Sequence, residues 1–230
     1  MNSYVYWQKR SEYEKIIKKE TLKNKIPTLL IHSCCAPCST YVLEYLSQYF
    51  KITILYYNPN IYPSEEYQKR AEEQEMLIKK MNLKNEVSLV ITPYDSNEYF
   101  EKIKGLENDI EGGSRCYKCY LLRMEKSAKY AKENNYDYFT TTLTISPHKN
   151  SKTINEIGSQ LEKKYQINYL YSDFKKKNGY KRSCELSKQY NLYRQDYCGC
   201  IFSKKERGKL NVLWFNYIIN YCVRHYILLP

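Results

Sequence analysis

The chain has 230 residues, of which 43% are hydrophobic and 27% are charged. These proportions are those of an ordinary globular protein, and they exclude a disordered chain and a collagen-like repeat. There are 37 Lys and Arg residues against 25 Asp and Glu residues, so the net charge is +12. An excess of this size favours a polyanionic partner or an anionic membrane surface.

Short apolar runs alternate with helical patterns along most of the chain. The patterns predict strands at 27–35, 52–57, 87–92, 138–145 and 168–172, and helices at about 40–50, 64–82, 115–134 and 151–165. Such alternation predicts an α/β fold, with a mostly parallel, Rossmann-like sheet flanked by helices. Ligands of these folds bind beyond the carboxyl ends of the strands, where we expect Cys34, Cys35 and Asn58.

The two ends of the chain are less regular. We expect a helical extension over residues 1–26, an α/β catalytic domain over 27–207 and a packing helix over 208–230. Polar residues such as Asn216 and Arg224 interrupt the last segment, so a membrane span is not expected. The N-terminus lacks the apolar stretch of a secretory signal, and we expect a cytoplasmic protein.

Nine cysteines occur in the chain, mostly in groups. The groups are Cys34, Cys35 and Cys38; Cys116 and Cys119; and Cys198 and Cys200, while Cys184 and Cys222 stand alone. Clustered thiols in a cytosolic chain indicate metal ligands or redox centres rather than structural disulfides. We expect the two isolated cysteines to be core or surface thiols.

The first two groups are suited to binding a metal. Cys34 and Cys35 can converge on one ion only if the backbone turns between them, as it does at the end of a strand. Cys116 and Cys119 are three residues apart at the start of a helix, where the helix dipole and Arg115 favour the thiolate. Together the four thiols match the ligand set of a [4Fe–4S] cluster or of a tetrahedral zinc ion, and their spacing does not separate the two metals.

The third group, Cys198-Gly199-Cys200, is suited to redox chemistry. A disulfide across one residue closes a small, strained ring, and strained disulfides are the labile ones. The alternative is that both cysteines are further metal ligands, with a second ion beside the first. Nearby carboxylates and a histidine are candidate proton donors, namely Asp196, Asp173 and His148.

Basic and aromatic residues surround this third group. The residues predicted to contact RNA are Lys175, Lys176, Lys177, Lys181, Arg182, Tyr193 and Arg194, and a second basic run follows at 204–209. Basic groups bind phosphates, and aromatic rings stack on splayed-out bases. The alternative is an ordinary solvated charged face.

Six sequence blocks together resemble a known family. HSCCAPC, YYNPNIYP with the following YQKR, EGGSRCYKCY, FTTTLTISPHKNS, DFKKKNGYKRS and LYRQDYCGC resemble the QueH type of epoxyqueuosine reductase, in order, over residues 27–207. The resemblance implies a nucleotide-hydrolase-like fold and reduction of an epoxide on a modified guanosine at the wobble position of tRNA, the last step to queuosine. The expected partners are therefore tRNA that carries epoxyqueuosine and an electron donor, and no membrane is expected.

The same resemblance implies roles for the cysteines. Cys34, Cys35, Cys116 and Cys119 would bind a [4Fe–4S] cluster, and Cys198 and Cys200 would form a redox-active pair. Family members carry Cys or Asp at the position of Cys38, so this residue would replace a cluster ligand or serve a second metal ion.

Two other functions remain open from the residues. A tRNA sulfurtransferase with an iron–sulfur cluster shares a related fold, but its Gly/Ser-rich pyrophosphate loop is replaced here by HSCCAPC. A non-catalytic, zinc-containing RNA-binding protein would explain the charge and four thiols. It would leave the third cysteine group without a role.

Overall fold

The computed structural model describes residues 26–208, which contain one five-stranded sheet. The strands are β1 (Thr28–His32), β2 (Lys51–Tyr56), β3 (Val87–Ile91), β4 (Tyr138–Thr141) and β5 (Asn168–Tyr169). Their order is β3-β2-β1-β4-β5, and every neighbouring pair is parallel. The predicted α/β fold with a parallel sheet is therefore confirmed. The helices predicted within 1–25 and 209–230 lie outside the described residues.

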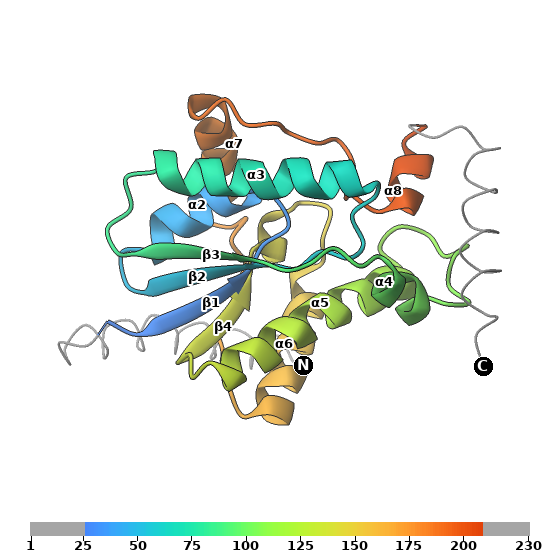
Figure 1. Ribbon diagram of the computed structural model, residues 1–230, viewed down its shortest axis with the longest axis horizontal. Helices are drawn as coiled ribbons and strands as arrows, with labels where there is room; N and C mark the ends of the chain where they lie inside the picture. Colours follow the sequence, from blue (N-terminus) through green and yellow to red (C-terminus); the bar gives the residue numbers. More distant parts are fainter. Residues whose placement is uncertain (1–25, 209–230) are drawn as a thin grey trace.

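Helices cover both faces of the sheet (Figure 1). They are α2 (Ala36–Leu46), α3 (Ser64–Lys80), α4 (Asn97–Lys102), α5 (Ser114–Glu133), α6 (Ser151–Tyr165), α7 (Gly179–Gln189) and α8 (Ile201–Glu206). The first two and α7 lie on one face, and α5 and α6 lie on the other (Figure 1). The carboxyl ends of the strands therefore lie between two helical layers.

Strand β1 shows why the sheet is covered on both sides. Leu29 and Ile31 pack against the apolar residues of α2, whereas Leu30 packs against residues of α5 and α6. Successive side chains of a strand point to opposite faces, so an unbroken apolar run is needed when both faces are buried. The run at 27–35 thus places its own end, and the thiols that follow it, at the centre of the sheet.

Several element boundaries differ from the prediction, and the strands predicted at 27–35 and 168–172 end at His32 and Tyr169. The strand predicted at 138–145 ends at Thr141, whose Oγ1 accepts a hydrogen bond from the Leu143 amide at 3.2 Å and starts a 3₁₀ helix, η1 (Thr142–Ile145). The helix predicted from residue 40 begins at Ala36, because Pro37 fits the first turn, where its missing N–H is not needed.

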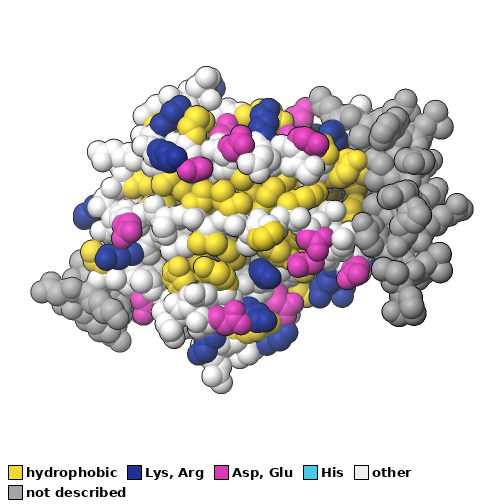
Figure 2. All heavy atoms as spheres, viewed as in Figure 1, with side chains coloured by type: hydrophobic (Ala, Val, Ile, Leu, Met, Phe, Trp, Pro, Cys, Tyr) yellow, Lys and Arg dark blue, Asp and Glu magenta, His cyan; other side chains and the backbone are white. Residues whose placement is uncertain are grey.

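The face of the molecule seen in Figure 2 carries interspersed acidic and basic side chains, with a hydrophobic band below α3. The net positive charge of the chain is therefore not concentrated on this face. Within residues 26–208, no helix combines the length and the apolar character needed to cross a membrane.

Candidate metal and redox site

The turn after β1 brings three thiols together. The Sγ atoms of Cys34 and Cys35 are 3.9 Å apart, and Cys38, in the first turn of α2, joins them so that all three sulfurs lie within 4.8 Å of one another. The predicted convergence of Cys34 and Cys35 is confirmed. Sulfurs that bind one tetrahedral ion at about 2.3 Å lie roughly 3.8 Å apart, so Cys34 and Cys35 already have this spacing, and the three thiols are close enough together to be candidate ligands of one metal ion.

Buried polar groups hold this turn in place. The hydroxyls of Ser33 and Ser39 donate to Oε1 of Gln74 at 3.0 and 2.7 Å, and Nδ2 of Asn58 donates to the Ser33 carbonyl at 2.8 Å. Buried polar groups of this kind are stable only when their hydrogen bonds are made. Asn58 thus lies beside the cysteines at the predicted edge of the sheet.

His32 links the ends of three strands. Its Nδ1 is 3.0 Å from Oγ1 of Thr141, and its Nε2 is 3.2 Å from the Tyr57 carbonyl oxygen. A carbonyl can only accept, so Nε2 donates and the Thr141 hydroxyl donates to Nδ1. Burial, assisted by the positive charge of Arg123, lowers the pKa of His32 to about 4, and the ring is neutral.

The three strand-end thiols share one negative charge. Hydrogen bonds with Cys35 and Cys38 hold the pKa of Cys34 well below its usual range. In return, Cys34 raises the pKa of Cys35 to about 12 and that of Cys38 well above its usual range. A bound cation is what allows neighbouring thiols to be deprotonated together, so this grouping fits a metal site.

Cys116 and Cys119 lie near the N-terminus of α5, as predicted, but the expected preference for the thiolate is wrong for the metal-free protein. Burial raises the pKa of Cys116, and it raises that of Cys119 to about 11. The guanidinium of Arg115, which pairs with Glu206 at 3.0 Å, lowers the pKa of Cys116 by less than burial raises it. The hydrogen bond that the Gly112 amide donates to Cys116 Sγ at 3.2 Å does not offset the loss of water.

The Cys198-Gly199-Cys200 segment presents its two thiols differently. Cys198 lines the cavity described below, whereas Cys200 is buried and its Sγ accepts the Ser203 amide at the start of α8. Both are free thiols, and burial raises the pKa of Cys200 to about 12. Gly199 has φ +114°, and a Cβ there would lie 3.0 Å from Nη1 of Arg70, so only glycine fits.

The three cysteine motifs are within electrostatic range of one another. Cys198 raises the pKa of Cys116, of Cys119 and of Cys200. Arg123, which lies four residues after Cys119 on the same face of α5, is electrostatically coupled to Cys119, Cys198 and Cys34. The fold therefore gathers seven cysteines from three distant segments around one region.

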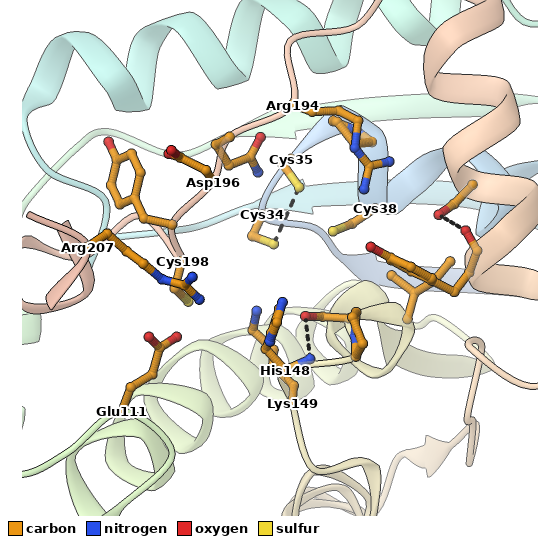
Figure 3. Close-up of a pocket in the computed structure, with 18 residues that line it drawn as sticks. Cys34, Cys35, Cys38, Glu111, His148, Lys149, Arg194, Asp196, Cys198 and Arg207 are labelled. Atoms are coloured by element: carbon orange, nitrogen blue, oxygen red, sulfur yellow. Dashed lines mark hydrogen bonds between the residues drawn. The ribbon is translucent and has the colours of Figure 1, made fainter. Parts of the chain in front are cut away.

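A cavity of about 350 Å³ opens beside these thiols (Figure 3). It is lined by Cys34, Cys35, Pro37, Cys38, Glu111, Ile145, Ser146, Pro147, His148, Lys149, Tyr180, Ser183, Arg194, Gln195, Asp196, Tyr197, Cys198 and Arg207. In Figure 3 the strand-end thiols face His148 and Lys149, Arg194 lies beside Cys35 and Cys38, and Cys198 lies toward Arg207 and Glu111. Cys184, on α7, does not line the cavity.

Three cations balance the charge of the thiols. Burial lowers the pKa of Lys149, but Cys198 and Cys34 outweigh it, so the net pKa is raised and the ammonium stays charged. Arg70 and Arg123 are both buried, and each has an Nη2 atom without a hydrogen-bond partner among residues 26–208. Unpaired buried donors of positive charge fit a site that takes an anionic thiolate–metal group.

Most of the residues predicted to contact RNA lie away from the cavity or make internal contacts. Arg182 pairs with Glu44 at 2.6 Å, the Tyr193 amide donates to Glu73, and Lys175 donates to the Lys149 carbonyl at 3.3 Å. The exposed residues of the set are Lys176, Lys177, Lys181 and Arg194. Arg194 is the member of the set that lines the cavity.

Two of the three candidate proton donors line the cavity, and the third makes an internal contact. Asp196 and His148 line the cavity, but Asp173 is buried and pairs with Lys175 at 3.2 Å. Sequence reasoning missed Lys149 and Gln195 in the cavity wall, although each adjoins a residue that it had selected. Arg123 was also missed, although its spacing of four residues from Cys119 places the two on the same face of a helix.

Comparison with known proteins identifies the family of this chain. The sequence model described as "Epoxyqueuosine reductase QueH" matches residues 29–206. Proteins of that name are similar to this chain in Streptococcus pyogenes (47% identity, 84% of this chain and 76% of the relative), Staphylococcus aureus (44%, 85% and 85%) and Thermotoga maritima (34%, 78% and 92%). The chain therefore belongs to the epoxyqueuosine reductase QueH family.

Proposed function

We propose that this protein reduces epoxyqueuosine to queuosine at the wobble position of tRNA, with electrons that pass through its thiols. The observation that carries the proposal is the gathering of three cysteine motifs within electrostatic range of one another, two of which line one cavity. The relatives are named for this reductase activity, and a zinc-containing RNA-binding protein would leave the third cysteine motif without a role. We further propose that the reaction takes place in the cytoplasm.

The reaction balances with the third cysteine pair. Opening an epoxide to an alkene and water consumes two electrons and two protons, and oxidation of Cys198 and Cys200 to a disulfide releases the same number of each. Cys198 faces the cavity and Cys200 is buried, which suits a pair whose first thiol meets the substrate. An external electron donor then returns the disulfide to the dithiol.

We assign Cys34, Cys35, Cys116 and Cys119 to a [4Fe–4S] cluster, which supplies electrons one at a time when bound. The unpartnered Nη2 atoms of Arg70 and Arg123 support an anionic group at this place. The close spacing of Cys38 to its two neighbours supports a second metal ion held with Cys38. The alternative is that Cys38 is itself a cluster ligand. Metal analysis of Cys38→Ser separates the two arrangements, because a protein with a second ion should lose that ion and keep the cluster.

Lys149 has a direct part in this proposal. It presents a positive charge to the cavity opposite the thiols, with no ion pair to an acid within residues 26–208 (Figure 3). A preorganised positive charge stabilises the negative charge that develops on the epoxide oxygen as its C–O bond breaks. The hydrogen bond that Lys175 Nζ donates to the Lys149 carbonyl holds the backbone at Lys149 in place.

The test is the conversion of tRNA that carries epoxyqueuosine by anaerobically purified protein with a reductant. Mass spectrometry of the digested nucleosides should show loss of one oxygen atom, and metal analysis should show iron and sulfide. Cys184→Ser, outside the cavity, is the matched control and should convert substrate at the wild-type rate. Stoichiometric zinc without iron, and no conversion, would contradict the proposal and favour the zinc-containing RNA-binding protein.

A further inference from the structure

The size of the cavity restricts what can enter it. A volume of about 350 Å³ is that of a small-molecule pocket, and an anticodon stem-loop is far larger. If the substrate is a nucleotide of tRNA, one base enters and the rest of the RNA stays outside. Splayed-out bases are held by stacking on aromatic rings and guanidinium planes and by hydrogen bonds to their edges.

One wall of the cavity offers a stacking surface. Tyr180, at the start of α7, is 37% exposed, and the guanidinium carbon of Arg194 lies 6.0 Å from the centroid of its ring. Both residues line the cavity, and Arg194 projects into it beside Cys35 and Cys38 (Figure 3). Such an aromatic and guanidinium pair is the kind of surface on which a flat base stacks.

The next residue along this wall offers a hydrogen-bond acceptor. Gln195 lines the cavity, and its Oε1 is buried without a hydrogen-bond partner among residues 26–208. A buried acceptor without a partner is costly, and a ligand that brings an N–H group removes that cost. The edge of guanine carries two such donors, the N1 hydrogen and the N2 amino group.

We propose that Gln195 Oε1 accepts a hydrogen bond from the N2 amino group on the guanine edge of the base that enters the cavity, while Tyr180 and Arg194 stack on its face. This inference rests on the proposed function, because it takes the substrate to be a modified guanosine in tRNA. The protein then selects its substrate by the purine edge as well as by the epoxide. The thiols and Lys149 face the reacting part of the nucleotide.

The test compares two anticodon stem-loops that carry guanosine or inosine at the wobble position, because inosine lacks only the N2 amino group. Affinities are measured without reductant. The wild type should bind the guanosine RNA roughly 3- to 10-fold more tightly, the effect of one hydrogen bond. Gln195→Met should bind both RNAs equally, with its affinity for the inosine RNA unchanged from the wild type.

Gln189→Met is the matched control, because Gln189 is exposed at the end of α7 and does not line the cavity. This variant should keep the preference for guanosine. Equal affinity of the wild type for the two RNAs, absence of binding to either, or a preference that survives in Gln195→Met would overturn the assignment of Gln195.

Stacking is tested at Tyr180. Tyr180→Phe keeps the ring and should retain wild-type affinity for both RNAs, whereas Tyr180→Ala should lose about 5-fold or more. Wild-type affinity in Tyr180→Ala would overturn the stacking role.

These outcomes are separate from the outcome for the proposed function. No epoxide and no reductant is present in the binding measurement. A protein that converts epoxyqueuosine but does not distinguish guanosine from inosine contradicts only this inference. A protein that distinguishes the two bases but does not convert epoxyqueuosine contradicts only the proposed reaction.

Discussion

The turn at 33–38 and the loop at 195–200 both bring thiols to one cavity, but they are held in different ways. The turn directly joins a central strand to its helix, so the positions of its cysteines follow from the chain path. The loop depends on distant partners, with the Tyr62 amide donating to the Gly199 carbonyl at 2.9 Å and Nη1 of Arg70 to the Cys198 carbonyl at 3.5 Å. Changes that displace the loop should therefore leave the turn intact.

The largest expected effect is loss of the metal from the first two cysteine motifs. Single Ser substitutions at Cys34, Cys35, Cys116 and Cys119 should each strip or destabilise the cluster, because a thiolate ligand is removed. Conversion of epoxyqueuosine should fall to background. Iron and sulfide analysis checks this, and full iron content in a double Ser variant at Cys116 and Cys119 would contradict the ligand assignment.

The loop should behave in the opposite way. Ser at Cys198 or at Cys200 should abolish multiple turnover and leave the iron content and visible spectrum unchanged, because neither thiol is assigned to the cluster. Alkylation of thiols after a single turnover without reductant provides the sharper measurement. Complete alkylation of both cysteines after one equivalent of product has formed would show that they do not supply the electrons.

The hydrogen bonds of buried His32 should contribute more to the stability of the turn than to the stability of the loop. His32→Leu leaves the Thr141 hydroxyl and the Tyr57 carbonyl without their partner, which costs about 2–4 kcal/mol of the free energy of unfolding. Thr141→Ser keeps the hydroxyl and is the matched control. Denaturant unfolding of both variants checks the prediction, and an unchanged midpoint for His32→Leu would show that the chain contributes little.

The loop can be disturbed alone at Gly199. Ala there meets a φ of +114° and contact with Arg70, a strain of about 1–3 kcal/mol. Turnover should slow while the iron content is unchanged. Gly105→Ala is the control, because Gly105 also has a positive φ (+80°) but nothing within 4 Å of its Cβ position. Equal turnover in the two variants would mean that the position of the loop does not limit the reaction.

The smallest effect is expected on the exposed surface. Glu at both Lys176 and Lys177 should weaken RNA binding and flatten its salt dependence, because two charges that release counterions are lost. The matched control replaces Lys79 and Lys80 with Glu, because both are exposed at the C-terminal end of α3. Titrations at several salt concentrations check this, and equal salt slopes in all three proteins would remove this surface from the RNA interface.

Much of the fold was predictable because its signals are local. Apolar runs of strand length and helical spacing predicted every strand of the sheet and the helices α2, α3, α5 and α6. The short helices α4 and α8 were not predicted, since six residues give too little periodicity. The end of β4 was misplaced because the Thr141 side chain, rather than the apolar pattern, starts the following 3₁₀ helix.

At the site, sequence by itself determined which thiols are neighbours. Residues within one turn of each other are joined by a short path, so the pairing of Cys34 with Cys35, and the placement of Cys116 and Cys119 at one helix end, follow from spacing. Tertiary structure alone decided that Arg70 touches the Cys198 carbonyl, 128 residues away, and that Gln195 lines the cavity. It also decided the protonation of Cys116 and Cys119, because the loss of water on burial depends on everything packed around a thiol and outweighs the local helix dipole.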